Sequence, residues 1–416
     1  MQLSNVQIIG QDGTKHIHIS EGKIVRVTDD REAVTANQST TSGQSATSGQ
    51  SAMSVQSATS GQSTTSGPGY RLHFEKAIAF PGLINSHDHL DFNLFPKLGN
   101  RVYKNYMEWG QDIHQQNKES IAAVLRVPLP IRIRWGLYKN LVNGITTVVH
   151  HGKREEVPKD LITVFQDAQS LHSVSAEKRW RWKLNNPFNK NQPLAMHIGE
   201  GTDPFAHSEI DELIKWNVLK RKLIGIHGVA MDEKQASAFR ALVWCPDSNH
   251  FLLNKTAPID RLKKVTKIVF GTDSTVSASW NIWEQMRLAR EQKMMGDAEL
   301  FDALTRTPAD IWGLKDRGDL GHGQSADIIV ANAASSWDAF YSLNPGDILL
   351  VLHEGNVRLF DGQLYDQLAG QGYPLGDFYP VIIGESRKFI QGDVPGLIGE
   401  IRKYHPSADF PIQTIP

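Results

Sequence analysis

The sequence predicts an α/β fold built from βα units, with a smaller β-domain formed by both ends of the chain. Two observations predict this fold. Short apolar runs alternate with helical stretches from residue 76 onward, and β-rich segments broken by turn signals lie near both chain ends. Alternating strands and helices are typical of βα units, and continuous apolar runs suit a parallel sheet covered on both faces.

The N-terminal segment 2–28 is expected to form short strands separated by QDG and EG turns. Residues 35–69 then repeat a six-residue unit, TSGQSA and its variants, which has no apolar face to bury. We therefore expect a disordered insertion in a surface loop. A six-residue β-helix is the alternative, but the unit lacks a recurring aliphatic position.

Five later apolar runs are strand candidates, because each is short, rich in Val, Ile or Leu, and followed by a polar residue. They cover residues 145–151, 194–200, 223–230, 241–246 and 267–273, and the run before His87 adds a sixth. Helices are expected at 283–294 and 300–314, and two further strands flank an HEGN turn within 346–366. The predicted parts are 1–80 in the β-domain, 81–315 as the catalytic unit, and 316–416 as the rest of the β-domain and a tail.

The residues that end these runs are unusual. In βα-barrels, catalytic residues lie at the C-terminal ends of the strands. Five of the six runs end in His or Asp, which packing alone does not explain. The residues are His87 and His89, His150 and His151, His197, His227, Cys245 and Asp273.

His87 and His89 are the first candidate metal ligands, since positions i and i+2 of a strand point to the same face. This spacing alone is weak evidence, because His16 and His18 repeat it without partner ligands in the sequence. We interpret that second pair as surface residues of the β-domain. His197 and Asp273 are the partners that we expect to complete the first site.

Three histidines and one aspartate suit zinc, with ferrous iron as the alternative, and such a site can lower the pKa of a bound water to ~7. Glu200 follows His197 by three residues and could move a proton to a leaving nitrogen. His227 could hold the water or the carbonyl-like centre of the substrate. Each residue also has a non-catalytic alternative. His197 and His227 could be structural histidines at a strand end or in the core, Asp273 a helix N-cap, and Glu200 an exposed loop residue.

The motifs together resemble the amidohydrolase superfamily, in the branch with guanine deaminase, cytosine deaminase and the triazine hydrolases. In family order they are FPGLINSHDH, GITTVVHHG, HIGEG, IGIHGVA, CPDSNHFLL, FGTD, RTPADIWGL and LGHGQSADIIV. The resemblance implies a (β/α)8 TIM-like barrel and a small β-sandwich built from both termini. It also implies a mononuclear site held by His87, His89, His197 and Asp273, with Glu200 as proton shuttle, His227 orienting water or substrate, and Asp273 helping to deprotonate the water.

The sequence departs from this family pattern between the second and fifth strands. Only 46 positions separate His151 from His197, whereas three βα units of a ~250-residue barrel need roughly 90. We therefore expect a distorted barrel with a shortened or missing βα unit. Gly199 replaces the family's usual alanine and keeps a small residue. Lys153 follows the second strand, not the fourth, which argues against a carboxylated lysine that bridges two metals.

Four residues are weaker candidates for substrate contact: His150, His151, Trp180 and His250. Each is as well explained by a plain structural role, and Trp180 could instead cover the shortened barrel. Cys245 is expected to be buried and not nucleophilic.

Composition narrows the function classes. A formal net charge of -1 argues against nucleic acid or an anionic membrane as the main partner. One cysteine, no signal peptide pattern and no apolar run near ~20 residues predict a soluble, cytoplasmic protein. We expect a small-molecule substrate and a homodimer as one option for its assembly.

The leading hypothesis is a metal-dependent hydrolase of the deaminase type, which breaks a C–N bond in a small heterocycle or amine. An amide, cyclic-amide or C–Cl hydrolase is the enzymatic alternative. A non-catalytic scaffold that kept the fold is the third, and the intact ligand set with Glu200 argues against it.

Overall fold

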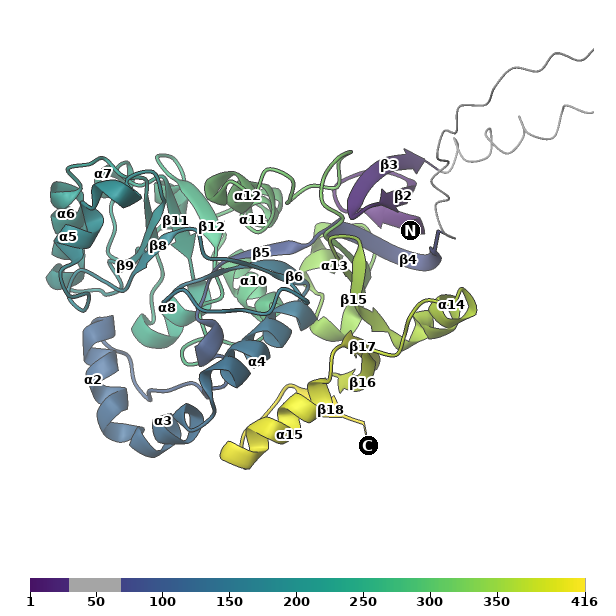
Figure 1. The fold of residues 1–416 in the computed structure, drawn as a ribbon. Coiled ribbons are helices and arrows are strands. Elements are labelled where there is room, and N and C mark those ends of the chain that lie inside the picture. The colour runs from purple at the N-terminus through teal and green to yellow at the C-terminus, as the bar shows by residue number, and fades with distance from the viewer. Residues whose placement is uncertain (30–68, 416) are drawn as a thin grey trace, which may run out of the picture.

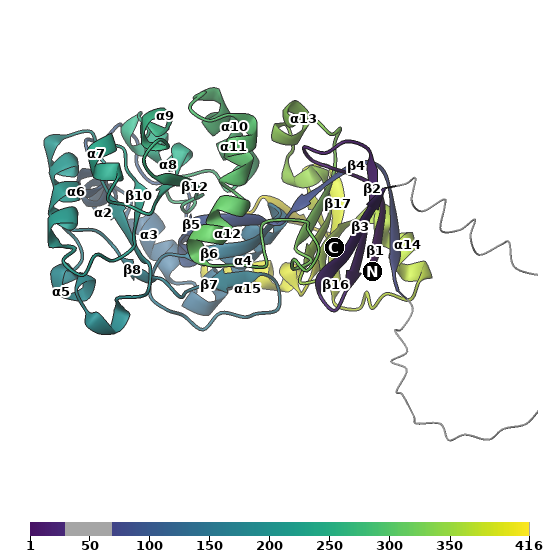
Figure 2. The ribbon, with the colours of Figure 1, turned by 90° about the horizontal axis from the view of Figure 1, so that it is seen from above.

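The computed structural model describes residues 1–29 and 69–415. The repeat predicted at 35–69 lies outside this range except for residue 69. Two parts lie side by side along the long axis of the molecule: parallel strands with their helices, and a large sheet that holds both chain ends (Figure 1, Figure 2).

The large sheet has ten strands in the order β18-β16-β17-β15-β14-β13-β4-β1-β2-β3. Strand β4 joins the two ends of the chain, because it pairs in parallel with β1 and antiparallel with β13. The strands from the two chain ends, which were predicted to form a β-sandwich, thus belong to one continuously hydrogen-bonded sheet. The domain boundaries proposed from the sequence stay a prediction. The strands are β1 (Gln2–Ile8), β2 (Thr14–Ser20), β3 (Lys23–Asp29), β4 (Arg71–Pro81), β13 (Ile328–Asn332), β14 (Ile348–His353), β15 (Asn356–Asp361), β16 (Phe378–Ile383), β17 (Ser386–Gln391) and β18 (Ile412–Thr414).

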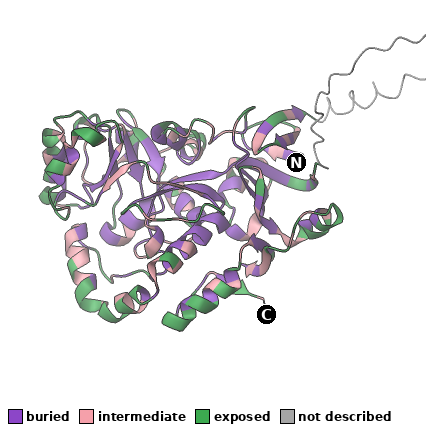
Figure 3. Ribbon diagram, viewed as in Figure 1, coloured by how far each residue is buried: buried purple, intermediate pink, exposed green. Residues whose placement is uncertain are grey.

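Eight further strands pair only in parallel, in one sheet of three and one of five. Every residue of β5, β6, β9, β10 and β11 is buried, which explains the continuous apolar runs (Figure 3). All six strand candidates of the sequence are present. The strands are β5 (Leu83–Asp88), β6 (Ile145–His150) and β7 (Thr163–Phe165), then β8 (Gln169–Leu171), β9 (Leu194–Ile198), β10 (Leu223–His227), β11 (Ala241–Trp244) and β12 (Lys267–Phe270).

The chain between the second and fifth parallel strands is shortened, as expected, and what it lacks is helices between the strands. Strands β7 and β8 are present but span three residues each. Residues 151–162 between β6 and β7 contain no helix, and only 166–168 separate β7 from β8. A crossover needs about a dozen residues, so this linker cannot hold one. Among the described strands, no ladder joins β7 to β8 or β12 to β5.

Helices cover the outside of the parallel sheets, and their outward faces are exposed (Figure 3). Helix α6 shows how they begin: Pro204 occupies its first turn, and the Asp203 side chain accepts a hydrogen bond from the Ala206 amide. In this part they are η1 (Leu90–Phe92), α2 (Tyr106–Gln116), α3 (Lys118–Leu125), α4 (Leu129–Val142), α5 (Trp180–Leu184), η2 (Pro187–Asn189), α6 (Pro204–Trp216), α7 (Glu233–Ala236), α8 (Pro246–Leu253), α9 (Ile259–Leu262), α10 (Ile282–Glu291), α11 (Asp297–Asp302) and α12 (Arg306–Trp312).

The C-terminal segment adds helices around the ten-stranded sheet. They are α13 (Trp337–Tyr341), η3 (Pro345–Asp347), η4 (Gly362–Leu364), α14 (Tyr365–Gly370) and α15 (Val394–Tyr404). Within residues 1–29 and 69–415, no helix combines the length and the apolar character that a membrane span requires.

Candidate metal centre

Strand β5 places the first two candidate ligands. His87 lies in the strand and His89 follows its last residue, with Asp88 between them. Their ring centroids are 4.9 Å apart, and His87 is buried while His89 is partly accessible. The two imidazoles therefore share one face, as the alternation of a strand predicts.

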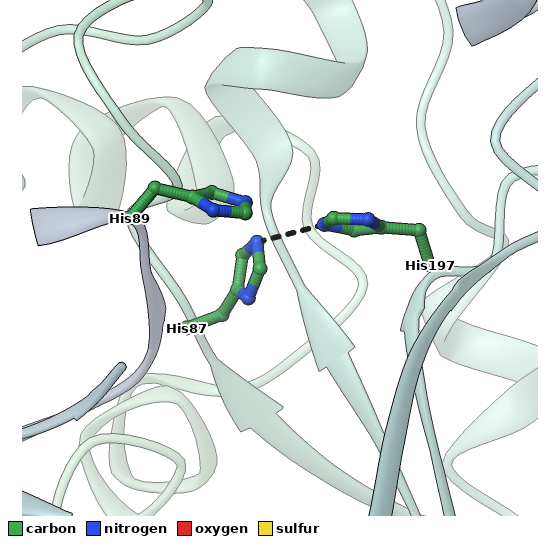
Figure 4. A group of neighbouring side chains, drawn as sticks. All are labelled: His87, His89 and His197. Atoms are coloured by element: carbon green, nitrogen blue, oxygen red, sulfur yellow. Dashed lines mark hydrogen bonds between the residues drawn. The ribbon is translucent and has the colours of Figure 1, made fainter. Parts of the chain in front are cut away.

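His197 approaches this pair from β9 in the other parallel sheet. Its Nε2 atom lies 3.2 Å from Nε2 of His87 (Figure 4). One ligand nitrogen from each of His87, His89 and His197 lies within 4.8 Å of the others. Three histidines that are far apart in the sequence thus converge, as the motifs predicted.

Asp273 completes the group from the segment after β12. Its Oδ1 atom lies 3.6 Å from Nε2 of His87 and 3.9 Å from Nε2 of His89. Its Oδ2 atom accepts hydrogen bonds from the hydroxyls of Ser248 at 2.7 Å and Ser277 at 3.0 Å. The backbone of Asp273 is left-handed, with φ of 55°. Such strain in a non-glycine residue is typical of functional sites.

Burial and neighbouring groups shift the pKa values of His89, His197 and Asp273. Burial lowers the pKa of His89 and of His197 well below the usual value, with neighbouring histidines adding to the effect. Burial acts to raise the pKa of Asp273, but the hydrogen bond and attraction from His87 lower it well below its usual value. Neutral imidazoles and an ionised carboxylate are the forms that bind a divalent cation. The donor set therefore fits zinc or ferrous iron.

Glu200 and His227 lie beside the four candidate ligands. Oε2 of Glu200 is 3.6 Å from Nε2 of His227, and both side chains are buried. Burial raises the pKa of Glu200 well above its usual value, and the Asp273 carboxylate adds to this. Burial also lowers the pKa of His227 to about 4. Burial thus favours the uncharged form of each group, a carboxylic acid beside a neutral imidazole.

The orientation of His227 is fixed from α8. Its Nδ1 atom lies 2.9 Å from Oδ1 of Asn249, whose Nδ2 donates to Oγ1 of Thr256. An amide oxygen can only accept, so Nδ1 of His227 carries the proton and Nε2 presents a lone pair toward Glu200. The φ of 73° at His227 turns the chain sharply at the end of β10.

Of the four weaker substrate candidates, only His151 has ring contacts with the candidate ligands His87 and His197. The His151 ring is buried at 4.5 Å from the His197 ring and 5.0 Å from the His87 ring, so it borders the site. The Nδ1 atom of His150 instead accepts from the Leu90 amide at 3.4 Å.

Trp180 and His250 lie elsewhere. Trp180 is part of the main apolar core. His250 on α8 interacts with Gln292 at the end of α10. As expected, Cys245 is fully buried, and burial raises the pKa of its thiol well above the usual value.

Sequence reasoning missed several neighbours of the site. His172 follows the three-residue strand β8, and its ring lies 5.1 Å from that of His197. Ser248 and Asn249 stand in the CPDSNHFLL motif, from which only Cys245 and His250 were considered as candidates. Their signal was present in that motif, whereas a strand as short as β8 gives no readable pattern.

Known proteins share the sequence pattern and the fold. The sequence model of the amidohydrolase family matches residues 195–358. A 5-methylthioadenosine/S-adenosylhomocysteine deaminase of Pyrococcus horikoshii is 25% identical over 214 residues, which are 44% of this chain and 51% of that protein. The chain thus spans about half the length of this curated relative.

Two further proteins match over more of the chain. A 5'-deoxyadenosine deaminase of Methanococcus aeolicus is 22% identical over 70% of this chain and 83% of its own. The crystal structure of an adenosine deaminase from Xanthomonas campestris with bound zinc has a TM-score of 0.68 at 15% identity, over 97% of both chains. The family match and this fold confirm the resemblance to the amidohydrolase superfamily.

Proposed function

We propose, from this confirmed resemblance to the amidohydrolase superfamily, that the chain is a metal-dependent aminohydrolase. It would release ammonia from an amino-substituted heterocycle by attack of water on the ring carbon. One observation carries the proposal: the buried carboxyl of Glu200 faces His227, which itself lies in a cluster with His87 and Asp273. A purely structural histidine cluster does not need a buried carboxylic acid beside it.

We assign His87, His89, His197 and Asp273 as the residues that hold the metal ion, with zinc preferred and iron as the alternative. The chemistry that a divalent ion supplies in such a site is the acidification of water near neutral pH. Ser248 and Ser277 fix the Asp273 carboxylate, so that Oδ1 stays turned toward His87 and His89.

Glu200 moves the protons. Because burial favours the protonated form of its carboxyl, Glu200 can first donate a proton to a ring nitrogen of the substrate. The resulting carboxylate accepts a proton from the attacking water and passes it to the amino group. The C–N bond then breaks and ammonia leaves. The ring carbon keeps the water oxygen as a carbonyl, and the second proton of the water returns to Glu200. His227 accepts a hydrogen bond through Nε2 and orients the water or the substrate.

The relatives support the substrate class. The two curated relatives are named as deaminases of adenine nucleosides, and the matched crystal structure is an adenosine deaminase. All three names specify loss of an amino group from a purine ring. We therefore propose an amino-substituted heterocycle, with purine nucleosides as the first substrates to test.

The test is ammonia release by the zinc-loaded wild-type protein and by Glu200→Gln. The amide keeps the shape of the carboxyl but cannot shuttle protons, so we expect kcat/KM to fall about 10²–10⁴-fold with unchanged zinc content. Glu400→Gln on the exposed face of α15 is the matched control and should retain full activity. Unchanged turnover of Glu200→Gln would remove this residue from the mechanism, and release of chloride in place of ammonia would favour a C–Cl hydrolase.

A further inference from the structure

Asp88 lies between His87 and His89 and points away from them. Strand alternation turns its side chain to the opposite face of β5, toward α4. The carboxylate is fully buried, and it accepts from Nζ of Lys139 at 3.1 Å and from Nδ2 of Asn140 and of Asn93 at 2.7 Å each. A buried ion pair therefore lies directly beneath the two candidate ligands.

Lys139 connects this pair to the segment that carries Asp273. Its side chain on α4 is almost fully buried, and Nζ also donates to Oγ1 of Thr272 at 3.0 Å. Thr272 directly precedes Asp273, and the Thr272 hydroxyl donates to the Asp273 carbonyl at 3.0 Å. The Lys139 ammonium group thus contacts Asp88, which lies between His87 and His89, and Thr272, which precedes Asp273.

Asn85 closes the network on the other side. Its Nδ2 donates to Oγ1 of Thr272 at 2.7 Å, and its Oδ1 accepts from the Thr272 amide at 3.0 Å. The Asp273 amide also donates to the His87 carbonyl at 3.0 Å. No ladder joins β5 to β12, so these bonds hold the ends of the two sheets in register.

We propose that Asp88 and Lys139 are positioning residues that set the spacing between His87, His89 and Asp273 and thereby the affinity for the metal ion. This inference rests on the metal site of the proposed function. A buried ion pair adds little net stability compared with well-packed apolar residues, because both charges lose their hydration. Its directional bonds instead orient the ligand segments, as outer-shell partners do in other metal sites.

The chain offers a matched control in a second buried lysine. Lys388 on β17 is fully buried, and its Nζ donates to Oδ2 of Asp361 at 2.6 Å and to the carbonyl of Ile348 at 2.7 Å. It lies in the ten-stranded sheet, outside the parallel sheets that carry the candidate ligands. Loss of either lysine should lower stability, but only loss of Lys139 should change metal affinity.

The experiment compares wild type, Lys139→Met, Lys388→Met and the double variant Asp88→Asn/Lys139→Met. The double variant removes both charges and leaves no unpaired buried carboxylate, so it is expected to fold even if Lys139→Met alone unfolds. Zinc affinity is measured by competition with a chromophoric chelator, and the stability of the metal-free proteins by thermal unfolding. We expect about 10–100-fold weaker zinc binding in the double variant, and wild-type affinity with a lowered Tm in Lys388→Met.

Two outcomes contradict the inference, and they can be told apart. A folded double variant with wild-type zinc affinity would show that the network is only structural, while the metal site of the proposed function stands. A wild-type protein that binds no zinc or iron would overturn the proposed function and this inference together.

Discussion

Two histidine pairs with the same sequence spacing differ in the sheet that carries them and in the side chains that face them. His16 and His18 lie on β2 in the ten-stranded sheet, whereas His87 and His89 lie at the end of β5. Burial and then the positive charge of Arg26 lower the pKa of His18. The β5 pair instead faces the carboxylate of Asp273 and a third imidazole. The comparison teaches that the i, i+2 spacing alone does not distinguish a candidate metal site, whereas converging partners from other strands do.

Removing a ligand from each pair gives the largest expected difference. His87→Asn removes a nitrogen that contacts both His197 and Asp273, so zinc affinity should fall by more than the about 10–100-fold typical of outer-shell changes. Ammonia release should fall to background. His18→Asn is the matched control, and its zinc content and activity should equal those of wild type. Zinc loss from His18→Asn of the same size would erase the distinction between the two pairs.

A smaller effect is expected from loss of one of the two serine hydroxyls that hold the Asp273 carboxylate beside the β5 pair. Ser248→Ala removes the 2.7 Å hydrogen bond to Oδ2 of Asp273 and leaves the Ser277 hydroxyl in place. Because one of two supports remains, we expect zinc affinity to fall about 10-fold. Ser208→Ala on the exposed side of α6 is the control. Chelator competition measures both, and equal affinities would mean that Asp273 needs no hydroxyl support.

The sequence predicted most of the parallel strands because each of these is a short apolar run followed by a polar residue. Strands β6, β9, β10, β11 and β12 all lie within the predicted ranges. Strands β7 and β8 escaped notice, since three residues are too few to show a period. The expected shortening was correct in place, and the missing helices that cause it could be located only in the structure.

The site itself was partly readable in the sequence. His87, His197, Glu200 and Asp273 could be proposed from the sequence because each ends or follows a strand. The contacts of His172, Asn249 and Lys139 depend on how the sheets meet, which no local pattern encodes. Lys139 in particular resembles an ordinary helix-surface lysine, although its side chain is buried against Asp88. Conversely, His250 follows a motif but points toward α10.

The most direct test of the account is X-ray absorption at the zinc edge on the wild-type protein reconstituted with one equivalent of metal. The account predicts one zinc ion per chain, with three imidazole nitrogens and oxygen donors at about 2.0–2.2 Å. The same spectrum should be obtained for His18→Asn. A spectrum without imidazole scattering, or one that changes when His18 is replaced, would contradict the assignment of His87, His89, His197 and Asp273 as the metal site.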